Sequence, residues 1–267
     1  MIHQLFIAKS GMFAFQRKMQ VITDNIANAQ TPGFKGSRTE MESLFPYIME
    51  QTITEFEDSS IPVGEKRKKY MQYGQGVRVN DVSRDLRQGV IEITNQPLDM
   101  AIEGVGFFQV RMPDGTLAYT RAGNFKSDNQ GTIVDPNGHP LEPSVRLPNN
   151  MTDIAITDDG KIMVYVNNEA VPREAGQLLL AKFQNPAGMK SVGQNLYVES
   201  PASGEPVFEN PGRNDMGRIR ERALEFSNVD IIDQLTSMIL TQRSFELIIK
   251  STSAGDAMLK AASDIGK

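Results

Sequence analysis

Apolar residues recur every seven positions at both ends of this chain, and this repeat limits the possible folds more than any other feature. Near the N-terminus, two sets of positions, three residues apart, carry the repeat. They are Leu5, Met12, Met19 and Ile26, and Ala8, Phe15, Ile22 and Ala29. Apolar residues at such a and d positions are typical of a helix that packs against another helix. A helix of about 28 residues would be a rod of roughly 40 Å.

A second repeat near the C-terminus has the same period. Its two interleaved sets are Ile231, Met238, Phe245, Thr252 and Leu259, and Leu235, Gln242, Ile249 and Asp256. Ser227 or Asn228 is a candidate N-cap, and Asp230 would favour the first turn through the helix dipole. We therefore expect a second long helix from about Val229 to Ala262.

Two ordinary amphipathic helices on a globular core would show similar stripes. Both helices are long, however, and they are separated by a segment that offers them few helical partners. A single long helix is marginal in water and gains its stability from packing. We therefore expect the two helices to pair as an antiparallel coiled coil, with both chain ends largely disordered in the free monomer and helical once copies of the chain assemble.

The first helix ends in the stretch NIANAQTPGFKGSR, residues 25–38. Asn25 and Asn28 are three residues apart and share one flank of the helix. Thr31 precedes Pro32, which disfavours further helix, and Pro32-Gly33 suits a type II turn. A slim helix end rich in amides would suit close packing of identical helices, although a generic helix terminus explains the same residues.

The middle of the chain has short alternating apolar runs with turn residues between them. Hairpins or turns are predicted at Asp114-Gly115, Asn137-Gly138 and Asp159-Gly160. The predicted fold class is therefore α+β, with long terminal helices, a partly extended connecting region and a central antiparallel β domain.

This pattern predicts three nested parts. Residues 1–38 and 227–267 form an inner coiled-coil assembly domain, and residues 39–95 and 185–226 form a connecting domain. Residues 96–184 form an outer β domain.

Charge and composition exclude several classes of protein. The chain has 28 Lys and Arg against 33 Asp and Glu, so its net charge of -5 argues against nucleic-acid binding. The basic run Glu65–Tyr70 is the exception, and we expect it to be a solvated loop. The absence of cysteine excludes disulfides and thiolate metal sites. The N-terminal residues lack the pattern of a cleaved signal peptide, and no apolar run is long enough to span a membrane.

Candidate chemistry is sparse. There are two histidines, no acidic pair with an evident acid–base role and no complete phosphate-binding glycine motif. We expect no enzymatic activity, no cofactor, no bound metal and no small-molecule substrate.

Six segments together resemble the rod–hook family of bacterial flagellar axial proteins, and within it the distal rod members. The segments are NIANAQTPGFK at 25–35, GQGVRV at 74–79, NQPLDMAIEGVGFFQV at 95–110, YTRAGNF at 119–125, NPAGMKSVGQNLYVES at 185–200 and SNVDIIDQLTSMILTQRSFE at 227–246. Their order covers nearly the whole chain, although Pro46–Tyr73 falls outside the resemblance. That gap leaves a proximal rod paralogue as an alternative.

The resemblance implies a structural subunit that polymerises with copies of itself into the flagellar drive shaft and transmits torque from the basal body to the hook. The implied partners are other rod proteins, the hook protein, the flagellar export apparatus and, where present, the P- and L-ring proteins that act as a bushing. The implied location is the periplasmic rod, reached by type III export without signal cleavage.

The stripes suggest which residues form the assembly interface. The predicted interface residues are Leu5, Met12, Phe15, Met19, Ile22, Asn25, Ile26, Asn28, Ile231, Leu235, Met238, Phe245 and Ile249. Two other functions remain open on the sequence: a secreted scaffold or adhesin that forms a closed oligomer, and a peptidoglycan hydrolase.

Overall fold

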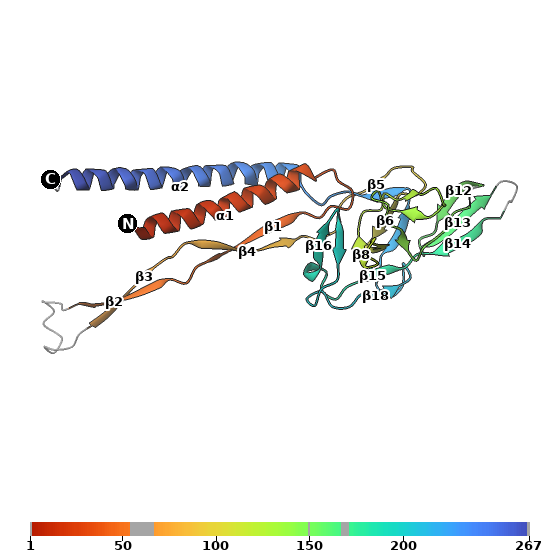
Figure 1. Ribbon diagram of the computed structural model, residues 1–267, viewed down its shortest axis with the longest axis horizontal. Helices are drawn as coiled ribbons and strands as arrows, with labels where there is room; N and C mark the ends of the chain where they lie inside the picture. Colours follow the sequence, from red (N-terminus) through yellow and green to blue (C-terminus); the bar gives the residue numbers. More distant parts are fainter. Residues whose placement is uncertain (1, 54–66, 149, 167–170, 266–267) are drawn as a thin grey trace. The chain divides into compact units, whose positions relative to one another are not determined.

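The computed structural model describes residues 2–53, 67–148, 150–166 and 171–265 of the chain. The chain forms two compact units. The terminal unit comprises Met1–Thr23, Arg38–Ser83 and Leu235–Lys267, and the β unit comprises Asp24–Ser37 and Arg84–Gln234. The α+β class with terminal helices and a β-rich centre is confirmed (Figure 1). The three-part division into assembly, connecting and outer domains stays a prediction.

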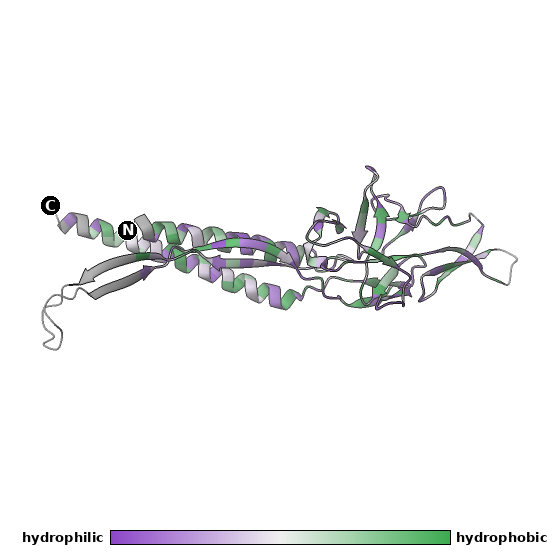
Figure 2. Ribbon diagram, turned by 90° about the horizontal axis from the view of Figure 1, so that it is seen from below, coloured by the Kyte–Doolittle hydropathy of each residue, from purple (hydrophilic) through white to green (hydrophobic). Residues whose placement is uncertain are grey.

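Two long helices are the main elements of the terminal unit. Helix α1 spans Ile2–Ala27 and helix α2 spans Ile231–Ile265. They lie side by side with opposite directions, so that the start of α1 and the end of α2 are at the same end of this unit (Figure 1). Apolar residues occur along both helices (Figure 2).

Helix α2 begins two residues later than the sequence suggested, because Asp230 is its cap. The Asp230 Oδ1 atom accepts hydrogen bonds from the backbone N–H groups of Ile232 at 2.8 Å and Asp233 at 3.3 Å. A carboxylate at this position satisfies backbone donors and complements the helix dipole. The prediction of Ser227 or Asn228 as the cap is therefore wrong.

The remaining elements of the terminal unit form a two-stranded ribbon. The strands are β1 (Ser37–Ser43), β2 (Tyr47–Ile53), β3 (Arg67–Tyr73) and β4 (Val77–Arg84). Strand β1 pairs with β4, and β2 pairs antiparallel with β3 from Tyr47↔Tyr73 to Ile53↔Arg67. Residues 67–70 of the basic run therefore lie in a strand rather than a loop, and residues 65 and 66 lie outside the described residues.

The β unit contains the other sixteen described strands. A five-stranded sheet has the order β11-β7-β8-β17-β16, a three-stranded sheet has the order β12-β13-β14, and four two-stranded pairs complete the unit. The strands are β5 (Ile91–Ile93), β6 (Met100–Glu103), β7 (Phe108–Arg111), β8 (Leu117–Thr120), β9 (Lys126–Ser127), β10 (Ile133–Val134), β11 (Leu141–Glu142), β12 (Met151–Ile156), β13 (Lys161–Val166), β14 (Arg173–Gln177), β15 (Leu180–Lys182), β16 (Lys190–Gly193), β17 (Leu196–Val198), β18 (Val207–Glu209), β19 (Arg218–Glu221) and β20 (Ala223–Glu225), with one 3-10 turn at Pro186–Gly188.

All three predicted turns are confirmed. Gly115, Gly138 and Gly160 have φ values of 85°, 88° and 81°, a conformation that glycine adopts without steric cost. The β structure continues past residue 184, because strands β16–β20 lie in the stretch that the sequence assigned to a connecting region.

Two apolar clusters hold the β unit together. The larger contains residues such as Met100, Phe108 and Ile162 from several strands. The smaller is aromatic: Phe107 and Tyr119 both pack edge-on against Phe183, with ring centroids 6.1 and 4.8 Å from it. Edge-to-face pairs add to the stabilisation from burial.

Tyr119 makes the stability of the β unit sensitive to alkaline pH. Burial, assisted by the charge of Glu199, raises the pKa of Tyr119 from 10.0 to about 12. Between these values the folded state keeps a proton that the unfolded state loses. This contribution to stability, on the order of 3 kcal/mol, is therefore complete below pH 10 and is lost as pH rises through the folded pKa.

We expect Tyr119→Phe to reduce the alkaline loss in urea unfolding measured as a function of pH, while the part that comes from Tyr197, whose pKa burial also raises, should remain. Tyr165→Phe, at a partly exposed position of β13, is the matched control and should keep the full loss. An unchanged pH dependence in Tyr119→Phe would contradict the assignment.

Candidate assembly surface

One face of α1 is buried in the chain. Gly11, Ala14 and Val21 are buried, together with Ile22. A side chain built on Gly11 would come within 3.0 Å of Ile248 Cδ1, so this glycine permits close approach of α1 and α2. Sequence analysis identified Ile22 but missed Gly11, Ala14 and Val21, which belong to neither of the two sets of heptad positions.

The ribbon contacts α1 through a glycine of the GQGVRV motif. The Ser10 hydroxyl donates to the Ile7 carbonyl at 2.8 Å and accepts from the Val77 N–H at 3.3 Å. Gly76 lies directly beside this hydroxyl with φ of 95°. A methyl group there would overlap Ser10 and also force an L residue into a strained conformation.

We expect Gly76→Ala to detach β4 from α1 locally, at a cost of about 1–3 kcal/mol. Gly74→Ala is the matched control, since a methyl group at Gly74 meets open space. Amide exchange of Val77 should accelerate in the first variant and not in the second. Equal exchange in both variants would show that the close approach at Gly76 is unimportant.

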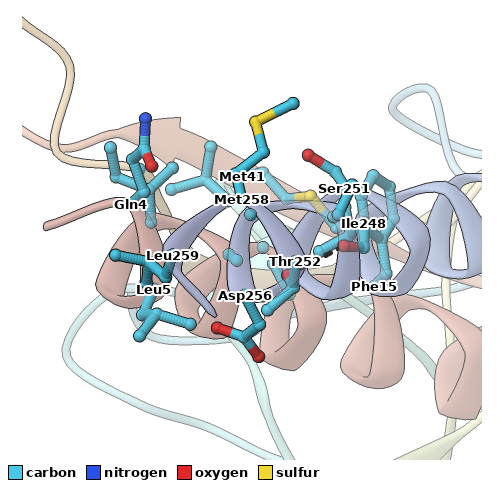
Figure 3. Close-up of a pocket in the computed structure, with 18 residues that line it drawn as sticks. Gln4, Leu5, Phe15, Met41, Ile248, Ser251, Thr252, Asp256, Met258 and Leu259 are labelled. Atoms are coloured by element: carbon cyan, nitrogen blue, oxygen red, sulfur yellow. Dashed lines mark hydrogen bonds between the residues drawn. The ribbon is translucent and has the colours of Figure 1, made fainter. Parts of the chain in front are cut away.

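A groove of about 690 Å³ runs between α1, α2 and the ribbon (Figure 3). At one end Leu5 of α1 lies beside Leu259 of α2, and at the other Phe15 lies near Ile248 (Figure 3). Its lining is mainly apolar and includes small residues that keep the groove open, namely Ala8, Gly11, Ala14, Gly76, Ala254 and Gly255.

Helix α2 has an inner face that is buried or half-buried in the chain. Its members recur with alternating spacings of three and four: Met238, Thr241, Phe245, Ile248, Thr252, Gly255 and Leu259. Of the predicted set Ile231, Met238, Phe245, Thr252 and Leu259, the last four lie on this face, whereas Ile231 is exposed. The interleaved set Leu235, Gln242, Ile249 and Asp256 is wrong for this face by one residue, because the helix turns Thr241, Ile248 and Gly255 inward instead.

A second apolar stripe on α2, here called the outer stripe, faces solvent in the single chain. It consists of Ile232, Leu235, Ile239 and Ile249, with exposed fractions of 75%, 46%, 52% and 46%. Large apolar side chains exposed along one helix face commonly mark an interaction surface. The polar residues Gln242 and Glu246 interrupt this stripe.

The predicted interface residues divide among three environments. Ile22 and Asn25 are buried; Met12, Phe15, Met19, Ile26, Asn28, Met238 and Phe245 are half-buried; Leu5, Ile231, Leu235 and Ile249 are exposed. The half-buried and exposed residues retain surface that another molecule can cover. Whether they contact another copy stays a prediction.

The side-chain amide of Asn25 makes its hydrogen bonds inside the β unit. Its Oδ1 accepts from the Ser37 N–H at 2.8 Å, and its Nδ2 donates to the Ser37 carbonyl at 2.8 Å and to Gln234 Oε1 at 3.2 Å. Asn28 bonds within its own helix end, to Asp24 and Thr31. Because Asn25 is buried and hydrogen-bonded within its own chain, the proposed contact between copies does not include it.

The β unit contains a buried charge cluster of three residues that are far apart in the chain. Lys35 and Arg121 both contact the carboxylate of Glu225, Lys35 at Oε1 and Arg121 at Oε2, the latter at 3.3 Å. Lys35 and Glu225 have fully buried side chains, and that of Arg121 is 6% exposed. Burial lowers the pKa of Lys35 and of Arg121, and the Glu225 charge opposes both shifts.

Backbone groups complete this cluster. Lys35 Nζ also donates to the Arg87 carbonyl at 2.8 Å, and the Gly89 N–H donates to Glu225 Oε1 at 3.0 Å. Arg121 donates to the carbonyls of residues 102 and 104, while its Nε has no partner among the residues that the structure describes. Sequence analysis missed this cluster, because its three members are far apart in the chain.

Within the described parts of the chain, no group of three or more His, Asp or Glu side chains is arranged to hold a metal ion. No described helix combines the length and the apolar character that crossing a membrane requires.

Comparison with known protein families gives three matches along the chain. Residues 5–35 match the flagella basal body rod protein family, and residues 101–164 match the D1 domain of the flagellar hook protein FlgE/F/G family. Residues 220–265 match the C-terminal family of the flagellar basal body rod FlgEFG proteins.

Curated relatives match over nearly the full length. The flagellar basal-body rod protein FlgG of Buchnera aphidicola subsp. Acyrthosiphon pisum is 41% identical, covering 99% of this chain and 100% of its own. The FlgG proteins of Caulobacter vibrioides and Bacillus subtilis are 38% and 36% identical, each covering 97% of both chains.

The chain belongs to the FlgG family of flagellar basal-body rod proteins. Because this family is structural, the chain is a structural subunit of the distal flagellar rod in the basal body. A solved structure, the hook protein FlgE2 of Helicobacter pylori, aligns with 71% of this chain and 43% of its own at 15% identity and a TM-score of 0.23, which is too low to bear on the fold.

The three family matches each contain one member of the buried charge cluster. Lys35 is the last residue of the basal-body rod match, Arg121 lies in the D1 match, and Glu225 lies in the C-terminal match. In this FlgG-family chain the cluster therefore joins all three family segments within the β unit.

Proposed function

We propose that this FlgG-family chain polymerises with copies of itself into a helical rod that transmits torque from the basal body to the hook. The contact is heterologous, because one surface of a copy meets a different surface of the next. Such contacts propagate without closing when successive rotations do not complete a ring.

The observation that carries this proposal is the outer stripe of α2. Its four large apolar side chains are 46–75% exposed in the single chain, and exposed apolar rows of this length are unfavourable in water. Leu5, Phe6 and Phe13 on α1 are exposed as well. We propose that neighbouring copies cover these residues.

The finer proposal is that α1 and α2 act as an antiparallel coiled coil in the assembled rod. The close approach at Gly11 and the alternating three-four spacing of the inner face of α2 support it. The small and hydroxyl-bearing residues on the inner face of α2 leave the groove open. We propose that a helix of a neighbouring copy fills this groove.

Family membership also suggests the partners. We propose contacts with other rod proteins and the hook protein at the two ends of the polymer, with P- and L-ring proteins around it where present, and with the flagellar export apparatus before assembly. The proposed location is the periplasmic rod, and the proposed role requires no catalysis, cofactor or small-molecule substrate.

Sedimentation velocity at increasing protein concentration tests the proposal against a closed oligomer. An open polymer grows continuously with concentration, so the mean sedimentation coefficient keeps rising. A plateau at a fixed oligomer size would contradict polymerisation and favour a closed scaffold. A turnover assay on purified peptidoglycan tests the hydrolase alternative, and we expect no products.

A further inference from the structure

The segment Thr31–Ser37, here called the latch segment, follows α1 and is held in the β unit by contacts to distant parts of the chain. The Gly33 N–H donates to the Glu225 carbonyl at 2.7 Å, and the Pro32 carbonyl accepts from Asn195 Nδ2 at 3.1 Å. Gly33 lies so close to the backbone of Ala122 that a methyl group would overlap it. The segment therefore lies directly on the β unit.

The second half of the latch segment is held by two asparagines. The Gly36 N–H donates to Asn228 Oδ1 at 2.9 Å, and the Ser37 N–H donates to Asn25 Oδ1 at 2.8 Å. Asn228 Nδ2 in turn donates to the carbonyl of Asp85 at 2.8 Å, and the Asp85 N–H donates to the Gly36 carbonyl at 2.8 Å. Hydrogen bonds thus join three segments of the chain, which are the latch segment, the segment at Asp85 and the segment at Asn228.

Lys35 is the central contact of the latch segment. Its ammonium, on a fully buried side chain, contacts the Glu225 carboxylate and the Arg87 carbonyl. The segment buries one large apolar side chain, Phe34, which is not a member of either core cluster. Its attachment is thus mainly polar and separate from the apolar core. Buried polar networks of this kind hold strongly when complete and fail when one member is removed.

We infer that Lys35 is a conformational latch, which fastens the end of α1 and the following segment to the β unit and can be released while the β core stays folded. Segments held by few apolar contacts open separately from a core in native-state exchange. The inference concerns a single chain and does not depend on polymerisation, so the two can fail independently.

The test is amide hydrogen exchange on the full chain, below the concentration at which it associates, with the variant Lys35→Met. Met has similar length without the charge. We expect exchange to accelerate roughly tenfold or more at the amides that the latch organises. These amides are Gly33, Gly36, Ser37, Asp85 and Gly89. The amides of Phe107 and Ala181, which bond to each other's carbonyls at 2.9 Å in the core, should remain strongly protected, because the core stays folded when the latch segment opens.

Two further variants make the test decisive. Lys126→Met, at an exposed lysine of β9, is the matched control and should change none of these rates. Asn228→Ala removes the Gly36 contact without touching the charges and should release Gly36 and Asp85. Unchanged exchange at the latch amides in Lys35→Met would overturn the inference. Loss of protection at Phe107 and Ala181 together with the latch amides would also overturn it, because the core would then unfold when the latch segment opens.

Discussion

Glu225→Gln should lower the free energy of unfolding of the β unit by about 3–5 kcal/mol, as expected when one partner of a buried ion pair is removed. The carboxylate serves two buried cations, Lys35 and Arg121, and also accepts the Gly89 N–H. Gln preserves the shape of the side chain but not its charge. Both cations would therefore remain buried without a counter-ion.

Urea unfolding followed by circular dichroism measures this loss, with Glu92→Gln as the matched control. Glu92 is exposed on β5, the strand that pairs with β20, and its substitution should cost less than about 0.5 kcal/mol. The double variant Lys35→Met, Glu225→Gln should lose less than the sum of the two single losses, because one of the stranded cations is absent. Additive losses would contradict direct coupling through the carboxylate.

Replacing Leu235 and Ile249 together by Asn should prevent polymerisation without unfolding either unit. Both side chains lie on the outer stripe of α2 and are 46% exposed, so their substitution removes little packing within the chain. If another copy covers these two half-exposed side chains, the contact between copies loses about 2–3 kcal/mol in total, which raises the concentration needed for polymerisation roughly 30- to 150-fold.

Gln242→Asn is the matched control on the same stripe, since it introduces the same residue without removing an apolar side chain. It should sediment like the unaltered chain at every concentration. Phe15→Asp provides the contrasting case, because Phe15 lies at the groove near Ile248. It should also abolish polymerisation, but through loss of contact between α1 and α2, while the β unit stays folded. Normal polymerisation of the variant with both Leu235→Asn and Ile249→Asn would show that the outer stripe is not an interface.

The terminal helices and the β turns could be predicted because their signals are local. A seven-residue apolar period indicates a helix without any knowledge of its partner, and Asp-Gly or Asn-Gly between alternating runs indicates a turn. The orientation of α2 was harder to predict. Ile248 and Ile249 are both apolar, and periodicity alone cannot decide which of two adjacent isoleucines faces inward. The structure turns Ile248 towards Gly11 and leaves Ile249 exposed.

Other features had no local signal at all. Asn25 reads as a surface amide in a helix end, yet the structure buries it against Ser37 and Gln234. Lys35 reads as an exposed turn lysine, and its buried partner Glu225 lies 190 residues away. The ribbon of β1–β4 was predicted only as partly extended chain, because its strands lack a regular apolar alternation: β1 has one apolar residue, and three of those in β2 are consecutive.

The sequence by itself determined which segments are helix, strand and turn, and its resemblance identified the family, because both depend on residues that are close together in the chain. Tertiary structure decided which helix faces remain exposed and which charges meet in the interior. These depend on distant segments coming together: the free energy of a buried lysine or an uncovered isoleucine is set by its neighbours in space, and no neighbouring residue in the chain encodes it.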